Sequence, residues 1–246
     1  MDAITVHVLL VVFIATLIRS AFGFGEALFA VPLLAFRLPL GIATPLAVLI
    51  SITIAGVVVI QDWQKVHWRS AGWLVAATLF GLPLGLLLLT SSHQEAVKVM
   101  LGLFLIGFCA YSLSSSKMPE LHTDSRIWLV GCGLFAGVLG GAYGMNGPPL
   151  VIYGTMRGWT PQHFRATLQG YFLPASIMGM IVYWLRGLWS PAVMHYYLLS
   201  LPAALPAIFV GRMVNRRLRG KSFLTFAYLC LAGIGAALLV QSLSDR

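Results

Sequence analysis

The chain has 246 residues, of which 59% are hydrophobic and only 9% are charged, and its formal net charge is +9. In a soluble domain roughly a quarter of all residues are charged, so this composition excludes an ordinary water-soluble protein and indicates a chain embedded in lipid. The excess of Lys and Arg does not predict nucleic-acid binding, because the basic residues lie between apolar stretches and form no continuous stripe.

The first apolar region, Ile4–Phe36, is interrupted by charges and by residues that disfavour helix. These are Arg19, Gly23, Gly25, Glu26 and Pro32. We expect two helical pieces joined by an unwound turn. Three charge-free stretches follow, at Leu38–Gln61, Ser70–Gln94 and Val99–Ser116. Since a helix needs about 20 residues to cross a hydrocarbon core of about 30 Å, these stretches predict transmembrane helices.

A second interrupted region opens the second half of the chain. Ile127–Met156 is free of charge over 30 residues, and as one helix it would be about 45 Å long. Its middle contains Gly137, Gly140, Gly141, Gly144, Gly147, Pro148 and Pro149. We therefore predict another pair of helical pieces around an unwound turn. Three further spans are expected at Ala166–Leu185, Gly187–Gly211 and Ser222–Ser244.

The two halves match each other at a nearly constant offset of 121 to 123 residues. The matches pair Ala21-Phe22-Gly23-Phe24 with Ala142-Tyr143-Gly144-Met145, Ala43-Thr44 with Ala166-Thr167, Ile54-Ala55-Gly56-Val57 with Ile177-Met178-Gly179-Met180, and Leu82-Pro83 with Leu205-Pro206. We predict that residues 1–113 and 126–246 are two copies of one unit. The polar stretch 114–125 is then a cytoplasmic linker.

The distribution of basic residues predicts how the copies are oriented. If each copy is a helix–break–helix hairpin followed by three spans, the second copy is inverted relative to the first. The cytoplasmic side then receives eleven basic residues and the outside four, with Arg19 left at a break. If each broken region crosses once, the split is nine against six. The inverted arrangement fits the positive-inside tendency better and places both termini outside. The eleven are Lys65, Arg69, Lys117, Arg126, Arg157, Arg165, Arg212, Arg216, Arg217, Arg219 and Lys221, and the four are Arg37, Lys98, Arg186 and Arg246.

The predicted fold is therefore an all-α polytopic membrane protein with two inverted-topology repeats, each with a broken-helix hairpin plus three transmembrane helices.

The breaks are the candidate substrate site. Unwound backbone at membrane depth is costly unless it lines a cavity, and a helix that begins there presents unpaired N–H groups and a positive dipole end, which suit an anion. Paired interrupted segments at matching positions are typical of transporter binding sites. The site is expected at Gly23-Phe24-Gly25-Glu26 and Gly144-Met145-Asn146-Gly147. The alternative is that these glycines only permit close helix packing.

Polar side chains near the breaks are further candidates. Arg19 could pair with the anion and Glu26 could carry a proton, or the two could form a salt bridge that pins the hairpin. Hydroxyl and amide donors lie on the spans that follow each hairpin. They are Thr44, Ser51, Thr53, Thr167, Gln169 and Ser176, and we include Thr44, Thr167 and Gln169 in the predicted site.

Other function classes lack their motifs. There is no GxxxxGK[ST] phosphate-binding loop, and no GxSxG, HExxH or paired acidic motif that would indicate an enzyme. The three cysteines lie far apart in apolar stretches, so we expect no metal site and no cofactor. An anion channel, in which the paired breaks form a selectivity filter, remains the alternative to a transporter.

The paired glycine-rich breaks, each followed by an Ala-Thr-containing span, resemble the TauE/SafE family of sulfite exporters, also called the 4-toluene sulfonate uptake permease family. In that family a Gly-rich run leads to a Val-Pro in each half. Here the first half has Gly23-Phe24-Gly25 and Val31-Pro32, and the second has Gly140-Gly141 and Gly144-Met145-Asn146-Gly147-Pro148-Pro149 without the Val-Pro.

The resemblance covers essentially the whole chain. It implies a bacterial inner-membrane transporter of sulfite, organosulfonates or related sulfur oxyanions, with export as the expected direction. In such a membrane, the topology expected from the basic residues places both termini in the periplasm. A proton is the expected coupling ion. A homodimer would suit so small a transporter, but nothing in the sequence specifies an interface.

Overall fold

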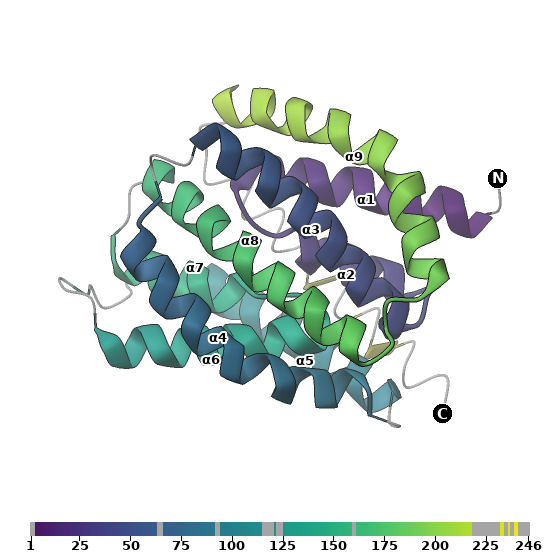
Figure 1. Ribbon diagram of the computed structural model, residues 1–246, viewed down its shortest axis with the longest axis horizontal. Coiled ribbons are helices and arrows are strands. Elements are labelled where there is room, and N and C mark those ends of the chain that lie inside the picture. Colours follow the sequence, from purple (N-terminus) through teal and green to yellow (C-terminus); the bar gives the residue numbers. More distant parts are fainter. Residues whose placement is uncertain are drawn as a thin grey trace.

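The computed structural model describes residues 3–62, 66–91, 94–114, 121, 125–158, 161–217, 232–233, 236 and 239–240. Over these residues all regular secondary structure is helical (Figure 1). The helices are α1 (Ala3–Phe22), α2 (Glu26–Ala35), α3 (Leu40–Asp62), α4 (Trp68–Leu89), α5 (Gln94–Ser114), α6 (Arg126–Tyr143), α7 (Gly147–Met156), α8 (Pro161–Leu185) and α9 (Pro191–Arg217). The last predicted span, Ser222–Ser244, lies almost entirely outside the described residues.

Both predicted broken helices are present. The turn between α1 and α2 passes through Gly23 and Gly25, with φ of 86° and 98°, and the turn between α6 and α7 passes through Gly144, with φ of 67°. Only glycine adopts this left-handed region at little cost, so these glycines end the helices where they stand. Pro148 and Pro149 lie in the first turn of α7, where their missing N–H groups interrupt no helical hydrogen bond.

The breaks are shorter than the sequence predicted. Gly137, Gly140 and Gly141 lie inside α6, and Pro32 lies inside α2. A Cβ atom on Gly137 would lie 2.4 Å from the Thr78 carbonyl oxygen, and one on Gly141 would lie 2.3 Å from that of Leu82. These two glycines therefore serve close packing of α6 against α4.

The helix boundaries repeat along the chain. Adding 121 to the bounds of α2 gives the bounds of α7, since 26 + 121 is 147 and 35 + 121 is 156. The same offset takes the first residue of α3 to that of α8, and an offset of 123 takes the first residue of α4 to that of α9. The division into two copies of one unit, residues 1–113 and 126–246, with 114–125 as a linker, stays a prediction.

Helices α3 and α8, which match at the offset of 121, run in opposite directions. Gly41 of α3 lies beside Leu188, just after α8, Ser51 is hydrogen-bonded to Ser176 in the middle of both helices, and the backbone N–H of His67 donates to Thr167 near the start of α8. Thus α3 and α8 are antiparallel and cross near the two serines. In Figure 1 the start of α1 and the connection from α8 to α9 lie at one end, and the last turn of α3 and the first turn of α4 lie at the other. The inversion of the whole second copy relative to the first stays a prediction.

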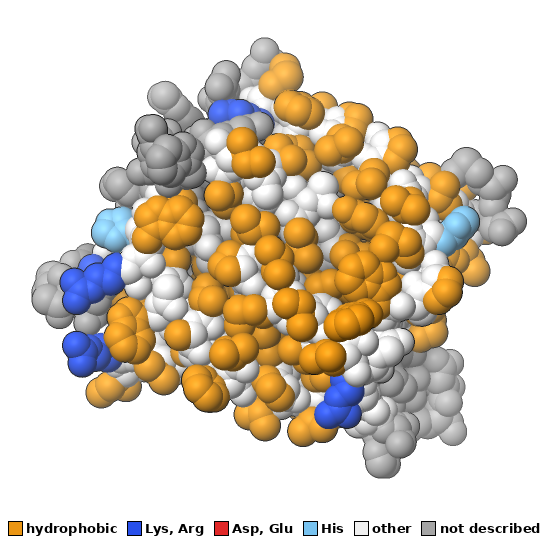
Figure 2. All heavy atoms as spheres, viewed as in Figure 1, with side chains coloured by type: hydrophobic (Ala, Val, Ile, Leu, Met, Phe, Trp, Pro, Cys, Tyr) orange, Lys and Arg blue, Asp and Glu red, His pale blue; other side chains and the backbone are white. Residues whose placement is uncertain are grey.

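The exposed surface is that of a membrane protein. Within the described residues, six helices are long and apolar enough to cross a bilayer: Ala3–Phe22, Leu40–Ile60, Trp68–Leu89, Arg126–Tyr143, Ala166–Leu185 and Pro191–Val214. Figure 2 shows hydrophobic side chains over the middle of one face, with Lys and Arg at its edges. Phe80 on α4, Trp184 on α8 and Phe209 on α9 are large hydrophobic side chains that are exposed. The chain is therefore a polytopic helical membrane protein.

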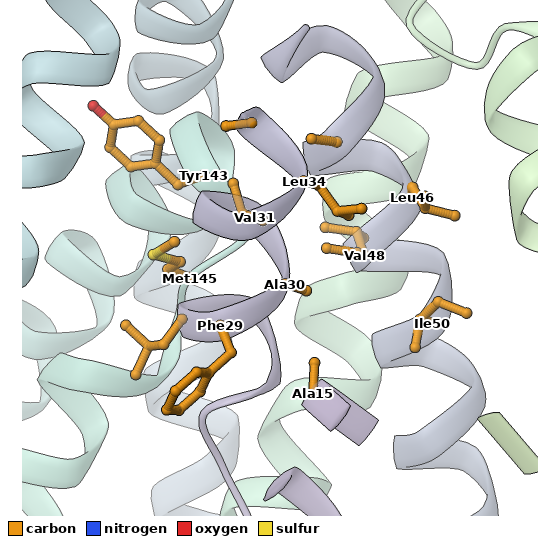
Figure 3. Packing of buried hydrophobic residues seen from close by; sticks show 14 of the residues in the cluster. Ala15, Phe29, Ala30, Val31, Leu34, Leu46, Val48, Ile50, Tyr143 and Met145 are labelled. Carbon is orange, nitrogen blue, oxygen red and sulfur yellow. The ribbon is translucent and has the colours of Figure 1, made fainter. Parts of the chain in front are cut away.

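The short helix α2 is enclosed by both halves. Figure 3 shows it between the α6–α7 break and α3, with Phe29 and Val31 toward Met145 and with Leu34 near Val48. All five side chains belong to one buried hydrophobic cluster. This packing fixes the position of the α2 N-terminus, which faces the second break.

Candidate functional site

The two breaks open into one pocket. It is lined from both halves of the chain. Its lining residues are Arg19, Phe24, Gly25, Glu26, Ala27, Leu28, Ser51, Gly144, Met145, Asn146, Gly147, Phe172 and Ser176. Because Ser51 and Ser176 lie near the midpoints of α3 and α8, the pocket lies about halfway along these two helices.

Arg19 is the charged centre of the pocket and is almost completely buried, with 3% of its surface exposed. Its Nη1 donates to Glu26 Oε2 and to Ser51 Oγ, both at 2.5 Å, and its Nη2 donates to Gln169 Oε1 at 2.9 Å. The guanidinium also lies 4.8 Å from the centre of the Phe172 ring, a cation–π distance. Side chains from α2, α3 and α8 thus hold this cation in place.

Glu26 is the first residue of α2 and is 2% exposed. Its Oε2 accepts the Arg19 hydrogen bond, whereas its Oε1 has no hydrogen-bond partner. A carboxylate at a helix N-terminus is stabilised by the helix dipole. The salt bridge that the sequence offered as one interpretation therefore exists, and it leaves one carboxylate oxygen and the Arg19 Nε unpaired.

The N-termini of the two short helices differ in the donors that they offer. At α2, Gly25 is the N-cap without a side-chain cap, and Ala27 and Leu28 line the pocket, so their N–H groups are near it. At α7, Pro148 and Pro149 have no N–H. The second helix therefore contributes fewer backbone donors than its counterpart.

Asn146 supplies the polar side chain at the second break and is 6% exposed. A Cβ on Gly140 would lie 2.1 Å from Asn146 Oδ1, so the glycine leaves the space that the amide occupies. Asn146 also shares a hydrogen bond with the Tyr171 hydroxyl, which is bonded in turn to Thr78. These contacts aim an amide group at the pocket from the second half of the chain.

Eight of the twelve predicted site residues line the pocket: Arg19, Phe24, Gly25, Glu26, Gly144, Met145, Asn146 and Gly147. A ninth, Gly23, lies in the same turn as Phe24 and Gly25, and its carbonyl accepts a hydrogen bond from Gln169. Gln169 does not line the pocket but holds two residues at its edge. Its Oε1 accepts a hydrogen bond from Arg19, and its Nε2 donates to the Gly23 carbonyl at 2.7 Å. It ties the first break to α8 of the other half.

The two repeat-equivalent threonines lie away from the pocket lining. Thr167 accepts a hydrogen bond from the backbone N–H of His67 at 3.2 Å, which places it at the start of α8. Thr44 is fully buried and its hydroxyl has no hydrogen-bond partner. Thr44 lies beside Gly144, so it packs against the second break without reaching the pocket.

Ser51, Phe172 and Ser176 also line the pocket. The two serines were among the candidate hydroxyl donors of the sequence, but none of the three was included in the predicted site. The signal that could have found two of them is helical spacing, because residues 172 and 176 follow Gln169 by three and seven positions and share its face of α8. Ser51 could not be found in this way, since its partners Arg19 and Ser176 come from other helices.

The assembled groups suit a small anion. One buried guanidinium, the N-terminus of α2, an amide and two hydroxyls surround the pocket, and oxyanions are bound by such donors. Among the residues that the structure describes, no group of three or more His, Cys, Asp or Glu side chains could hold a metal ion.

Comparisons with known proteins point to the same chemistry. A family model described as "Sulfite exporter TauE/SafE" matches residues 8–238. A curated relative from Cupriavidus necator, named "Probable sulfite/organosulfonate exporter TauE", is 24% identical over 185 residues, which cover 74% of this chain and 72% of the relative. No solved structure matches the chain.

Proposed function

This chain belongs to the TauE/SafE sulfite exporter family, and from that premise we propose that it is a secondary transporter that carries small sulfur oxyanions, sulfite or an organosulfonate, out of the cell. The family is one of exporters and not of enzymes. The proposed location is the bacterial inner membrane, with both termini in the periplasm and a proton as the coupling ion.

The observation that carries this proposal is the meeting of two helix breaks and a buried arginine at one pocket. An intramembrane charge is costly and usually functional, and here it lies where a positive helix end also lies. Because the pocket is lined from two halves whose matching helices α3 and α8 run in opposite directions, a rocking motion of one half against the other could expose it to each side in turn.

Binding is tested by thermal unfolding of the purified protein in detergent with sulfite, sulfate, thiosulfate, methanesulfonate or chloride. A ligand that binds only the folded state stabilises it, by about 2.7 kcal/mol at a concentration of 100 times Kd. We expect a selective shift with a sulfur oxyanion in the native protein and a much smaller shift in Asn146→Ala. Equal shifts with all five anions, or none, would contradict a specific oxyanion site.

Transport is tested with proteoliposomes loaded with radiolabelled sulfite or methanesulfonate. A transporter gives saturable efflux that external substrate accelerates by exchange, whereas the alternative, an anion channel, gives ohmic currents without exchange. Saturable exchange supports the proposal. Ohmic current with no exchange would replace it with the channel.

A further inference from the structure

The carboxylate of Glu26 occupies the place where the proposed substrate would bind, at the α2 N-terminus and on the Arg19 guanidinium. We propose that the oxyanion replaces this carboxylate on Arg19 only when Glu26 takes up a proton, so that anion and proton bind together. This inference rests on the proposed function and identifies Glu26 as the residue that couples the proton to the anion.

The geometry gives both anions the same donors. Arg19 Nη1 now donates to Glu26 Oε2 at 2.5 Å, and the neighbouring Ala27 and Leu28 are at the positive end of α2. Glu26 Oε1 lines the same pocket without a partner. A sulfonate or sulfite group carries similar oxygen acceptors, so it competes for the groups that the carboxylate already holds.

The need to keep the buried pocket electrically neutral links anion binding to protonation of Glu26. With Glu26 ionised, Arg19 and Glu26 together carry no net charge. A monovalent anion entering this state would leave a net charge of −1 in a buried site, which is strongly unfavourable at membrane depth. If Glu26 is protonated as the anion binds, Arg19 and the anion form the neutral pair and Glu26 becomes an uncharged acid.

The other titratable groups on the surrounding described helices have different tasks. On α1, His7 is hydrogen-bonded to the Leu33 carbonyl at the far end of α2. On α6, the Tyr143 hydroxyl is hydrogen-bonded to the Val97 carbonyl. On α8, the Tyr171 hydroxyl is hydrogen-bonded to the Thr78 hydroxyl, and the Tyr183 hydroxyl donates to the Gly140 and Gly141 carbonyls. Tyr153 on α7 is also buried and has an interaction partner. Within the described residues that line the pocket, Glu26 is the acidic group and Arg19 the basic one.

The anion replaces the Glu26 carboxylate on Arg19 by transfer of a proton alone. A proton from the aqueous side adds to a carboxylate oxygen of Glu26, and the Arg19–Glu26 ion pair breaks. The anion then accepts the hydrogen bonds from Arg19, and no covalent bond other than the new O–H forms. Release on the opposite side reverses both events, so the transported unit is one anion with one proton, which is electrically neutral for a monovalent substrate.

The decisive experiment measures proton uptake by the native protein. Methanesulfonate is added to the purified protein in weakly buffered detergent solution, and a pH indicator records the protons taken up. Its sulfonate stays ionised over the working range, so any uptake comes from the protein. We expect about one proton per anion bound, and by linkage an affinity that rises about tenfold for each unit by which pH falls, until Glu26 is protonated in the free protein.

Variants test whether Glu26 is the group that titrates. Glu26→Gln imitates the protonated acid, so methanesulfonate should bind it without proton uptake and with pH-independent affinity, and its transport should become sensitive to membrane potential. Glu26→Asp keeps a carboxylate and should keep proton uptake. If Glu26→Gln does not fold, the measurement on the native protein still decides.

The two proposals fail in different ways. Binding of methanesulfonate without proton uptake, or proton uptake that persists in Glu26→Gln, would overturn the coupling inference and leave an oxyanion transporter standing. Absence of oxyanion binding and flux at every pH would overturn the proposed function itself.

Discussion

The two helix breaks occupy equivalent positions but carry different chemistry. Adding 121 to Arg19 and Glu26 gives Gly140 and Gly147, so the first break holds an ion pair where the second holds glycines. The second break has Asn146 where the first has Gly25. The repeated backbone thus makes two similar turns, and the side chains assign charge to the first and a neutral amide to the second.

Space explains why the second break cannot copy the first. Asn146 fills the volume beside Gly140, so that position has no room even for a methyl group unless the amide moves. Charge gives a second reason, since two arginines facing one small pocket would repel each other in a medium of low dielectric constant. We therefore expect the charged half to anchor the anion and the neutral half to orient it.

The largest expected effect comes from removing the charge of the first break. Arg19→Ala leaves Glu26 as a buried, uncompensated carboxylate, so the free energy of unfolding should fall by about 3–5 kcal/mol. Thermal unfolding in detergent measures this loss, and the oxyanion-dependent shift should disappear. Arg186→Ala, at an exposed arginine between α8 and α9, is the matched control and should change stability by about 0.5 kcal/mol or less.

A double variant separates stability from binding at the first break. Arg19→Ala with Glu26→Ala removes both charges and should regain part of the lost stability without regaining oxyanion binding. Selective oxyanion binding by this double variant would show that the neutral half is the anchor, contrary to our comparison.

The second effect concerns the scaffold of the second break. A Cβ on Gly85 of α4 would lie 2.0 Å from the Val138 carbonyl oxygen of α6, so Gly85→Ala must push the two backbones apart. We expect a loss of about 1–3 kcal/mol in thermal unfolding. Gly72→Ala, on the same helix with no atom within 4 Å, should be neutral or stabilising by up to about 1 kcal/mol. Equal effects of the two substitutions would argue against this packing.

The third prediction tests the amide of the second break. Gly140→Ala should displace the Asn146 side chain and weaken oxyanion binding about tenfold, or about 1.4 kcal/mol. Titration by thermal shift measures the affinity. Gly131→Ala on the same helix has no atom within 4 Å and should leave the affinity unchanged. Unaltered affinity in Gly140→Ala would mean that the neutral half does not touch the anion.

The smallest effect is expected where the halves cross. Ser176→Ala removes the 3.2 Å hydrogen bond to Ser51 and should reduce stability by about 0.5–1.5 kcal/mol. Ser51→Ala alone and the two substitutions together complete a cycle that measures their coupling. If Ser176→Ala abolished binding as Arg19→Ala is expected to, hydroxyl groups and not charge would be the main anchor.

Much of the architecture could be predicted because it follows from local composition. Runs of about 20 apolar residues predict spans, and the glycines of positive φ at 23, 25 and 144 mark the turns. The error was to read Gly137, Gly140 and Gly141 as helix breakers. A glycine that ends a helix and one that lets two helices touch look alike in sequence, and only the contact with α4 or with Asn146 distinguishes them.

The sequence by itself determined that the chain crosses the membrane, that it is interrupted twice at matching positions, and that it resembles the sulfite exporter family, since hydropathy, glycine and an offset are readable along the chain. Only the tertiary structure decided which polar groups meet. Arg19 and Gln169 are 150 residues apart, and Ser51 and Ser176 are 125 apart. Arg19 of α1 meets Gln169 of α8, and Ser51 meets Ser176 where the antiparallel helices α3 and α8 cross. Such contacts are a property of packing between segments and not of any one segment.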